Sequence, residues 1–145
     1  MAMRKARAEW QGGLKEGRGT VAVGSGVYEG PYSYKSRFTE DEQTATNPEE
    51  LIGAAHAGCY SMQLGAMLEA EGHPPDYVRT EAAVELRAGE GGSHIRSIRL
   101  STTGRVPSID AAKFEEVARD AKEACLITQA LGAVPEITLD INFEG

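Results

Sequence analysis

The sequence predicts an α+β fold in which an antiparallel, strand-rich shell surrounds one long buried helix. Three observations support this class. Short strand-like segments separated by glycines fill residues 5–38, an apolar helical pattern covers residues 47–72, and a hairpin, a second helix and a closing strand fill residues 73–145. Strands that are grouped along the chain, with helices grouped between them, are typical of α+β proteins.

Length and composition favour one globular domain. The chain has 145 residues, of which 41% are hydrophobic and 26% charged, so we expect a single domain with its own core over residues 1–145. A net charge of −7 argues against nucleic-acid binding, because phosphate recognition relies on clustered lysines and arginines. No apolar run approaches the roughly 20 residues that a bilayer crossing needs. The basic N-terminus leads into Glu9 and Trp10 and not into an apolar signal segment, so we expect a cytoplasmic protein.

Residues 1–46 should form a β-meander followed by a loop. Strand-like alternation runs over residues 6–10, 19–23 and 32–38, and glycines between these segments are typical of turns. The acidic and polar segment 39–46 is expected to connect the meander to the next element.

Residues 47–72 should form the central helix. Asn47 can cap the first amides, Pro48 suits the first helical position, and two glutamates favour the positive end of the helix dipole. The helix is apolar on nearly all sides, so we expect it to be buried between the sheet and other elements. Gly72 is expected to end it.

Residues 73–145 should contain a hairpin, a second helix and a closing strand. The hairpin is expected over residues 78–106 with its turn at the glycine-rich segment 89–92. Asp110 is the expected cap of the second helix, which should end close to Cys125.

The end of the chain carries the clearest strand pattern. A short turn over residues 127–131 should lead to the closing strand at residues 136–143, where polar and apolar residues alternate.

Cys59 and Cys125 are the only cysteines, and each lies within or at the end of a predicted helix. In a reducing cytoplasm this placement favours a redox pair over a structural disulfide. A cysteine attacks as its thiolate, and burial in apolar surroundings raises the pKa of a thiol, so a reactive Cys59 needs a nearby cation. The alternative is that either cysteine is a small buried hydrophobe without chemistry.

Arg37 and Glu49 are candidates for that cation and for the group that orients it. Arg37 should end a strand just before the loop that leads to the central helix. Glu49 lies in the first turn of that helix, where its carboxylate could bind a guanidinium through two parallel hydrogen bonds. The alternative is that Arg37 is a solvated strand residue and that Glu49 complements the helix dipole.

The spacing between Glu49 and Cys59 has a geometric consequence. Ten positions separate them, which on one straight helix is about 15 Å along the axis and about 80° around it. If both serve one site, a second subunit must supply the glutamate, and an isologous dimer would then build two equivalent sites.

His56 lies one turn before Cys59, where it could contact that thiol or, with Cys125, bind a metal ion. The spacing matches no strong zinc signature, and a single histidine in an apolar helix is more often a hydrogen-bonded core residue. Three classes therefore stay open: a thiol enzyme, a metal or small-ligand binding module that uses His56, Cys59 and Cys125, and a redox sensor without high turnover.

The segment over residues 47–60, NPEELIGAAHAGCY, resembles nearly letter for letter the central-helix motif of the OsmC/Ohr family, the osmotically inducible and organic hydroperoxide resistance proteins. Segments 8–10, 36–38 and 137–140 extend the resemblance over essentially the whole chain and favour the OsmC branch. The resemblance implies an intertwined homodimer and a thiol-dependent peroxidase that reduces organic hydroperoxides and, more weakly, hydrogen peroxide.

The resemblance also implies roles by position. Cys59 matches the peroxidatic cysteine, Cys125 the resolving cysteine, Arg37 the arginine of the OsmC branch and Glu49 its partner. Cys59 would become a sulfenic acid and then form a disulfide with Cys125, which an external dithiol such as a lipoylated protein would reduce without metal, haem or flavin. Leu126 stands where the family commonly has proline.

Overall fold

The computed structural model describes residues 1–40 and 44–145, so residues 41–43 of the loop predicted at 39–46 lie outside the described part. The chain forms two compact units, Met1–Leu51 and Ile52–Gly145. A single domain over the whole chain stays a prediction.

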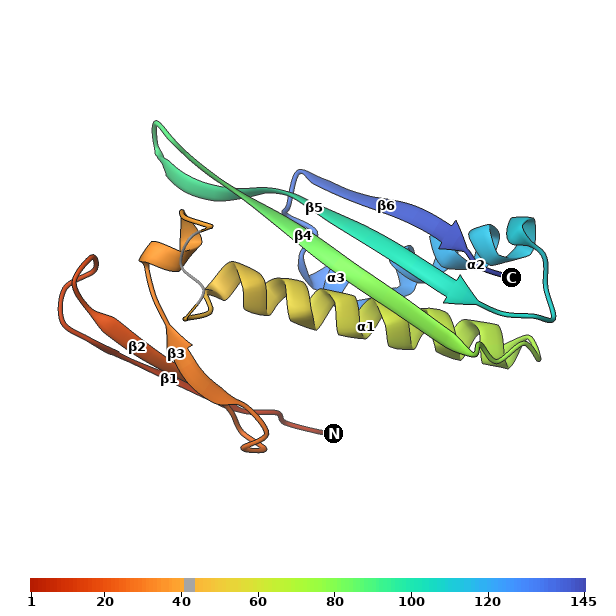
Figure 1. The fold of residues 1–145 in the computed structure, drawn as a ribbon, viewed down its shortest axis with the longest axis horizontal. Helices are drawn as coiled ribbons and strands as arrows, with labels where there is room; N and C mark the ends of the chain where they lie inside the picture. The colour runs from red at the N-terminus through yellow and green to blue at the C-terminus, as the bar shows by residue number, and fades with distance from the viewer. Residues whose placement is uncertain (41–43) are drawn as a thin grey trace. The chain divides into compact units, whose positions relative to one another are not determined.

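The Met1–Leu51 unit contains a three-stranded antiparallel sheet, drawn in red to orange in Figure 1. Its strands are β1 (Ala6–Gln11), β2 (Arg18–Val23) and β3 (Glu29–Tyr32), in the order β1-β2-β3. The first two strands agree with the predicted segments.

The third predicted strand, over residues 32–38, is wrong. The strand ends at Tyr32, and Lys35–Arg37 forms a 3-10 helix, η1. The Ser36 amide donates to Ser33 Oγ at 3.0 Å, and the Ser36 hydroxyl donates to the carbonyl of Thr46 at 2.9 Å. These serine side chains give the backbone local partners that compete with a strand ladder, so Arg37 projects from a helical turn.

Helix α1 (Pro48–Ala70) is the predicted central helix. Asn47 caps it, because its Oδ1 accepts from the amide of Glu50 at 2.8 Å. After the helix, Gly72 has a φ of +88°, and the amide of His73 donates to the carbonyl of Leu68 at 2.9 Å. This pattern closes the last turn of a helix, and glycine adopts the left-handed conformation that it needs at little cost.

The Ile52–Gly145 unit contains a second sheet, β4 (Tyr77–Gly89), β5 (Gly92–Arg105) and β6 (Glu136–Phe143), in the order β4-β5-β6. The hairpin β4–β5 is antiparallel, as predicted, but β6 pairs with β5 in parallel. This parallel pair departs from the wholly antiparallel shell. The chain between β5 and β6 contains helices, and such a crossover returns the next strand in the same direction.

Two helices connect β5 to β6. Helix α2 (Ala111–Ala124) begins as predicted, with Asp110 Oδ1 accepting from the amide of Lys113 at 2.9 Å. Leu126–Ala130 forms the short helix α3, so the turn predicted over residues 127–131 is wrong. The amide of Gln129 donates to the carbonyl of Cys125 at 3.1 Å, which gives this segment a helical hydrogen bond.

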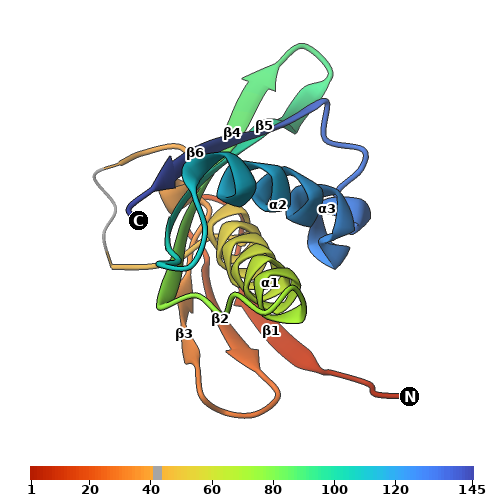
Figure 2. The same cartoon turned by 90° about the vertical axis from the view of Figure 1, so that its right-hand side faces the viewer.

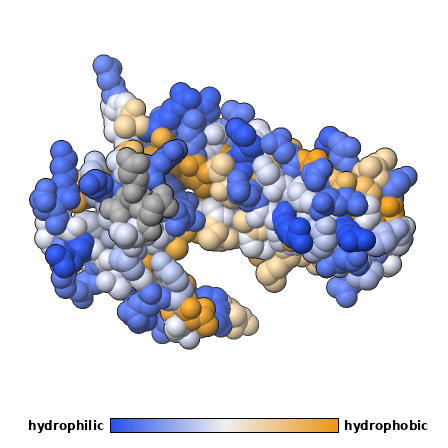
Figure 3. Space-filling view, in the orientation of Figure 1, coloured by the Kyte–Doolittle hydropathy of each residue, from blue (hydrophilic) through white to orange (hydrophobic). Residues whose placement is uncertain are grey.

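Helices α1 and α2 lie against the same face of this sheet (Figure 2). The core between the helices and the sheet is mainly apolar. Its largest fully buried side chains include Tyr60, Phe114, Leu64, Leu68, Ile98 and Leu100, and the polar side chains of His56 and Thr102 are fully buried as well. In Figure 3, hydrophilic side chains with smaller hydrophobic areas between them cover the right-hand side of the view, where α2 and the ends of this sheet lie. Among the described residues, no helix is long and apolar enough to span a membrane.

Burial of α1 is one-sided in the single chain. Tyr60, Leu64 and Leu68 are buried, whereas Met62 is 77% exposed. The expected burial against the sheet and other elements is therefore met on one face of the helix, while the other apolar face is exposed in the single chain.

Candidate active site

Arg37 and Glu49 form a close ion pair within the Met1–Leu51 unit. Arg37 Nη2 donates to Glu49 Oε1 at 2.6 Å, and Arg37 Nε donates to Glu49 Oε2 at 3.1 Å. The two parallel hydrogen bonds are those expected from the sequence. The hydrogen bond from Glu49 raises the pKa of Arg37 above its ordinary value, more than partial burial lowers it, so the guanidinium keeps its charge. Glu49 is only 8% exposed, which restricts the pair to one geometry.

Asn47 joins the two elements that carry this pair. Its Oδ1 caps α1, while its Nδ2 donates to the carbonyl of Ser36 in η1 at 3.1 Å. One side chain therefore fixes both the helical turn that bears Arg37 and the helix start that bears Glu49. The sequence indicated the cap but not the second hydrogen bond.

A mainly apolar pocket lies beside Arg37 in the same unit. Its volume is about 220 Å³. Its walls come from β1 and the turn after it, from β3, from η1 with the segment before it, and from the first residue of α1. They comprise Trp10, Leu14, Tyr32, Ser33, Tyr34, Arg37 and Pro48. The rings of Trp10 and Tyr32 lie with their centroids 5.4 Å apart. Sequence reasoning missed this pocket, because residues so far apart in the chain carry no local pattern that links them.

The two cysteines meet within the Ile52–Gly145 unit. Both are free thiols; Cys59 is half-buried, and Cys125 is fully buried at the junction of α2 and α3. Cys59 packs against the core cluster that contains Cys125, and its thiol lies near enough to lower the pKa of Cys125. The two thiols thus lie close together in this unit.

Several dipoles surround the Cys125 sulfur. Burial raises the pKa of Cys125, but the amide and hydroxyl of Thr128, then the Cys59 thiol and the amide of Ile127, together lower that pKa below its ordinary value. The Cys125 side chain makes no cap hydrogen bond to α3. The nearby dipoles favour the ionised form of its sulfur.

His56 is a buried core residue, which is the alternative that the sequence offered to a thiol contact or a metal ligand. Its Nε2 lies 2.7 Å from the hydroxyl oxygen of Thr128, and its Nδ1 has no hydrogen-bond partner among the described residues. Burial lowers the pKa of His56, so the ring is neutral at pH 7. Over residues 1–40 and 44–145, no group of three or more His, Cys, Asp or Glu side chains could hold a metal ion, which weighs against the metal-binding module.

The structure therefore pairs the four predicted residues two by two: Arg37 with Glu49, and Cys59 with Cys125. Thr128 is the residue that the sequence analysis missed. The signal available was a hydroxyl three positions after the second cysteine, which by itself is too common to single out.

Comparisons with known proteins show which family the chain resembles. A model of the OsmC-like protein family matches residues 40–140. The chain is 44% identical to Peroxiredoxin OsmC of Escherichia coli (strain K12) over 142 residues, which is 97% of this chain and 96% of that protein. The same figures hold for Peroxiredoxin OsmC of Shigella flexneri.

Solved structures show the same fold at lower identity. The organic hydroperoxide resistance protein OhrB of Bacillus subtilis matches with a TM-score of 0.68 and 22% identity, covering 97% of this chain and 98% of that one. An OsmC-like protein of unknown function from Vibrio cholerae matches with a TM-score of 0.76 and 16% identity, covering 97% and 99%. With a family match over residues 40–140 and 44% identity to a relative over nearly its whole length, the chain belongs to the OsmC-like protein family, in its OsmC branch.

Proposed function

We propose that this protein is a thiol-dependent peroxidase that reduces organic hydroperoxides to alcohols, with Cys59 as the nucleophile and Cys125 as the resolving thiol. The observation that carries the proposal is the contact between two free thiols, one half-buried and one fully buried, within one core. The 44% identity to a protein named Peroxiredoxin OsmC supports the same activity.

The first chemical step transfers one oxygen. The Cys59 thiolate attacks the outer oxygen of the hydroperoxide, the O–O bond breaks, and the electron pair of that bond leaves on the alkoxide, which takes up a proton to become the alcohol. Cys59 becomes a sulfenic acid. A guanidinium beside the reacting atoms stabilises both the thiolate and the charge that grows on the departing oxygen.

Arg37 is the residue we assign to that task. Two parallel hydrogen bonds hold its guanidinium on Glu49, and the hydrogen bond to Glu49 raises its pKa, so Arg37 supplies a positive charge at a fixed position. Among residues 1–40 and 44–145, no carboxylate accepts a hydrogen bond from Nη1 of Arg37, so this group can donate to the peroxide oxygen.

The pocket beside Arg37 supports a preference for organic hydroperoxides. Aromatic and aliphatic walls of about 220 Å³ can bury an alkyl or aryl group, and hydrogen peroxide has no such group to bury. Ser33 and Arg37 are its polar lining groups, which would direct the hydroperoxide end of a substrate toward the guanidinium. Hydrogen peroxide would then be the weaker substrate.

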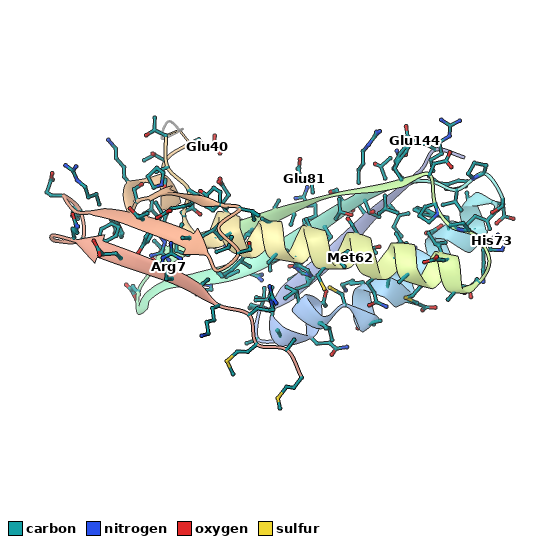
Figure 4. The ribbon with its side chains drawn as sticks, turned by 90° about the horizontal axis from the view of Figure 1, so that it is seen from below. Arg7, Glu40, Met62, His73, Glu81 and Glu144 are labelled. Atoms are coloured by element: carbon teal, nitrogen blue, oxygen red, sulfur yellow. The ribbon has the colours of Figure 1, made fainter. Side chains whose placement is uncertain are left out.

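We assign the remaining partner to a second copy of this chain. Helix α1 leaves a stripe of small and apolar side chains exposed, made of Ala54, Ala55, Gly58, Met62 and Ala66. Figure 4 shows Met62 on this helix. A Cβ built on Gly58 would meet nothing within 4 Å, so a second backbone has room to approach there. A stripe of this kind on a water-exposed helix is stabilised by burial against another protein surface.

The helix itself supports the second copy. Because α1 is continuous from Pro48, Glu49 and Cys59 lie ten positions apart on one helix, about 15 Å along its axis. In an isologous dimer the Arg37–Glu49 pair of one subunit would serve the Cys59–Cys125 pair of the other. An external dithiol, such as a lipoylated protein, would reopen the disulfide by exchange, and such chemistry fits a reducing cytoplasm.

The thiol assignments are tested by single and multiple turnover. Consumption of cumene hydroperoxide in a stopped-flow instrument should vanish in Cys59→Ser, whereas Cys125→Ser should consume about one equivalent per chain and then stop. The mass of the wild-type protein after one equivalent should show the loss of both thiols without added oxygen. Unchanged steady turnover in Cys59→Ser would refute the assignment.

The shared site is tested by mixing two inactive variants. Cys59→Ser and Arg37→Ala should each be inactive as homodimers. Random exchange of subunits makes half of the dimers mixed, and each mixed dimer contains one intact site out of two, so about a quarter of the wild-type activity should return. If each chain built its own complete site, mixing would restore nothing.

A further inference from the structure

Thr128 lies near two groups that the proposed reaction does not yet use together. Its hydroxyl oxygen lies 2.7 Å from Nε2 of His56. Cys125 precedes α3 as its N-cap and Thr128 is the third residue of that helix, so their side chains lie at the same end of α3, while α1 supplies His56 and Cys59. Burial raises the pKa of Cys125, and the amide and hydroxyl of Thr128 make the largest contributions that lower it.

We propose that Thr128 acts in the resolving step of the peroxidase: its hydroxyl, oriented by His56, donates to Cys125 and holds that sulfur ready to attack the sulfenic acid of Cys59. Thr128 contacts a reacting atom, and His56 is a positioning residue that acts through it. The inference rests on the proposed function, since it concerns the second step of that reaction.

The direction of the hydrogen bonds follows from the number of hydrogens. A threonine hydroxyl has one hydrogen, so it can donate to the sulfur only if it does not donate to His56. The neutral ring carries one N–H, and Nδ1 is buried without a partner. A hydrogen on Nδ1 would be an orphaned buried donor, which is rarer in proteins than an unpaired acceptor. The hydrogen therefore belongs on Nε2, where it donates to Thr128 and leaves the hydroxyl hydrogen for Cys125.

This arrangement suits the chemistry of resolution. The sulfur of Cys125 attacks the sulfur of Cys59, an S–S bond forms, the S–O bond of the sulfenic acid breaks, and the oxygen leaves with the thiol proton as water. No further oxidant is needed, because the peroxide has already oxidised Cys59. A hydroxyl donor stabilises the thiolate before attack, and it has to be held in place because a buried sulfur cannot be stabilised by water.

Two titratable groups of α1 affect or are affected by Cys125. Cys59 is its reaction partner, and Tyr60 lies close enough for its pKa to be raised, first by burial and then by the charge of Cys125. The Tyr60 hydroxyl is engaged elsewhere, since it donates to the carbonyl of Ala118 at 2.9 Å. Thr128 is therefore the side-chain hydroxyl that can serve the sulfur.

The test compares Thr128→Val, which keeps the shape of the side chain, with Thr128→Ser, which keeps the hydroxyl. After one equivalent of cumene hydroperoxide, rapid quenching with dimedone measures sulfenic acid, and mass spectrometry measures disulfide. Thr128→Val should form the sulfenic acid at the wild-type rate but close the disulfide about tenfold more slowly at pH 7, the effect of about one pKa unit on the attacking thiol. Thr128→Ser should close it within about twofold of wild type, and Thr138→Val, an exposed threonine on β6, should leave both steps unchanged.

A second measurement does not depend on peroxidase activity. In the Cys59→Ser background, ultraviolet absorbance of the thiolate reports the titration of Cys125 alone. Thr128→Val and His56→Leu should each move its midpoint upward by about one unit, whereas His56→Gln, which keeps an N–H donor, should move it less. Thermal unfolding identifies any variant that does not fold. Among the folded variants, the comparison of Thr128→Val with Thr128→Ser tests the role of the hydroxyl.

The outcomes separate the two proposals. Equal disulfide rates and equal titrations in wild type and Thr128→Val would overturn the role of Thr128. Wild-type protein that consumes no hydroperoxide would overturn the proposed function, while a shifted Cys125 titration in Thr128→Val would still support the contact.

Discussion

Leu126→Pro tests whether the residue after the resolving cysteine matters for its backbone. Leu126 stands where the OsmC/Ohr family commonly has proline. Three features of the structure predict that proline fits. Leu126 is the first residue of α3, where proline is favoured, and Cys125 before it has φ −64° and ψ 124°, the extended conformation that a following proline requires. No carbonyl of the described residues accepts a backbone hydrogen bond from the Leu126 amide.

The magnitude follows from what is lost and gained. The Leu126 side chain is 70% exposed, so its removal costs little packing. The proline ring restricts the unfolded chain, and at a compatible site this stabilises a protein by about 0.4–1 kcal/mol. For a chain of this length that raises the unfolding midpoint by about 1–4 °C. Because the Cys125 backbone already has the required conformation, the rate of disulfide closure should change by less than about twofold.

The assay is denaturant and thermal unfolding of the reduced protein at one fixed concentration, since association makes the midpoint depend on concentration. Leu126→Ala is the matched control, because it removes the exposed leucine without adding the ring. Rapid quenching after one equivalent of peroxide gives the closure rate. A loss of more than about 1 kcal/mol in Leu126→Pro relative to Leu126→Ala would show that the amide or the backbone angle matters, contrary to the structure.

Three further changes have outcomes that the structure fixes. Burial lowers the pKa of His56, so between that lowered pKa and about 6.5 the unfolded chain binds more protons than the folded chain. The free energy of unfolding, measured by urea unfolding from pH 7 to pH 5, should therefore fall as the pH drops through this window. His56→Gln should flatten this slope, and an identical slope would count against a buried neutral ring. Tyr60→Phe removes the hydrogen bond to the Ala118 carbonyl at 2.9 Å and should cost about 1 kcal/mol in urea unfolding, whereas a stabilised variant would mean that this bond contributes nothing. Gly104→Ala would place a Cβ in steric overlap with Cζ of the buried Phe114, so it should cost about 1–3 kcal/mol in urea unfolding. The double variant Gly104→Ala with Phe114→Leu should recover part of the loss, and no loss in the single variant would show that the Phe114 ring moves freely.

Local signals in the sequence predicted most of the elements. The cap at Asn47, the cap at Asp110 and the alternation over residues 136–143 each depend on neighbours in the chain. The structure contains both cap hydrogen bonds and a strand with alternating burial over residues 136–143. The errors lie where side chains distant in the sequence decide. The strand predicted through Arg37 became a 3-10 helix because Ser36 bonds to the carbonyl of Thr46, ten positions away.

The parallel direction of β6 was also outside the reach of a local pattern. Alternation indicates a half-buried strand but not its partner or its direction. The direction depends on the crossover through α2 and α3, which places β6 beside β5 on the opposite edge from β4.

By itself, the sequence predicted which residues carry the chemistry: two cysteines, an arginine and a glutamate, of which Glu49 and Cys59 lie in a motif specific enough to indicate a family. Only the tertiary structure decided how these groups are supported. It contains the bidentate Arg37–Glu49 pair, an aromatic pocket beside it, and a Thr128 hydroxyl 2.7 Å from His56. The physical reason is that the charge on a thiol or a guanidinium is set by donors and by burial within a few ångströms, and such neighbours come from parts of the chain that have no pattern in common.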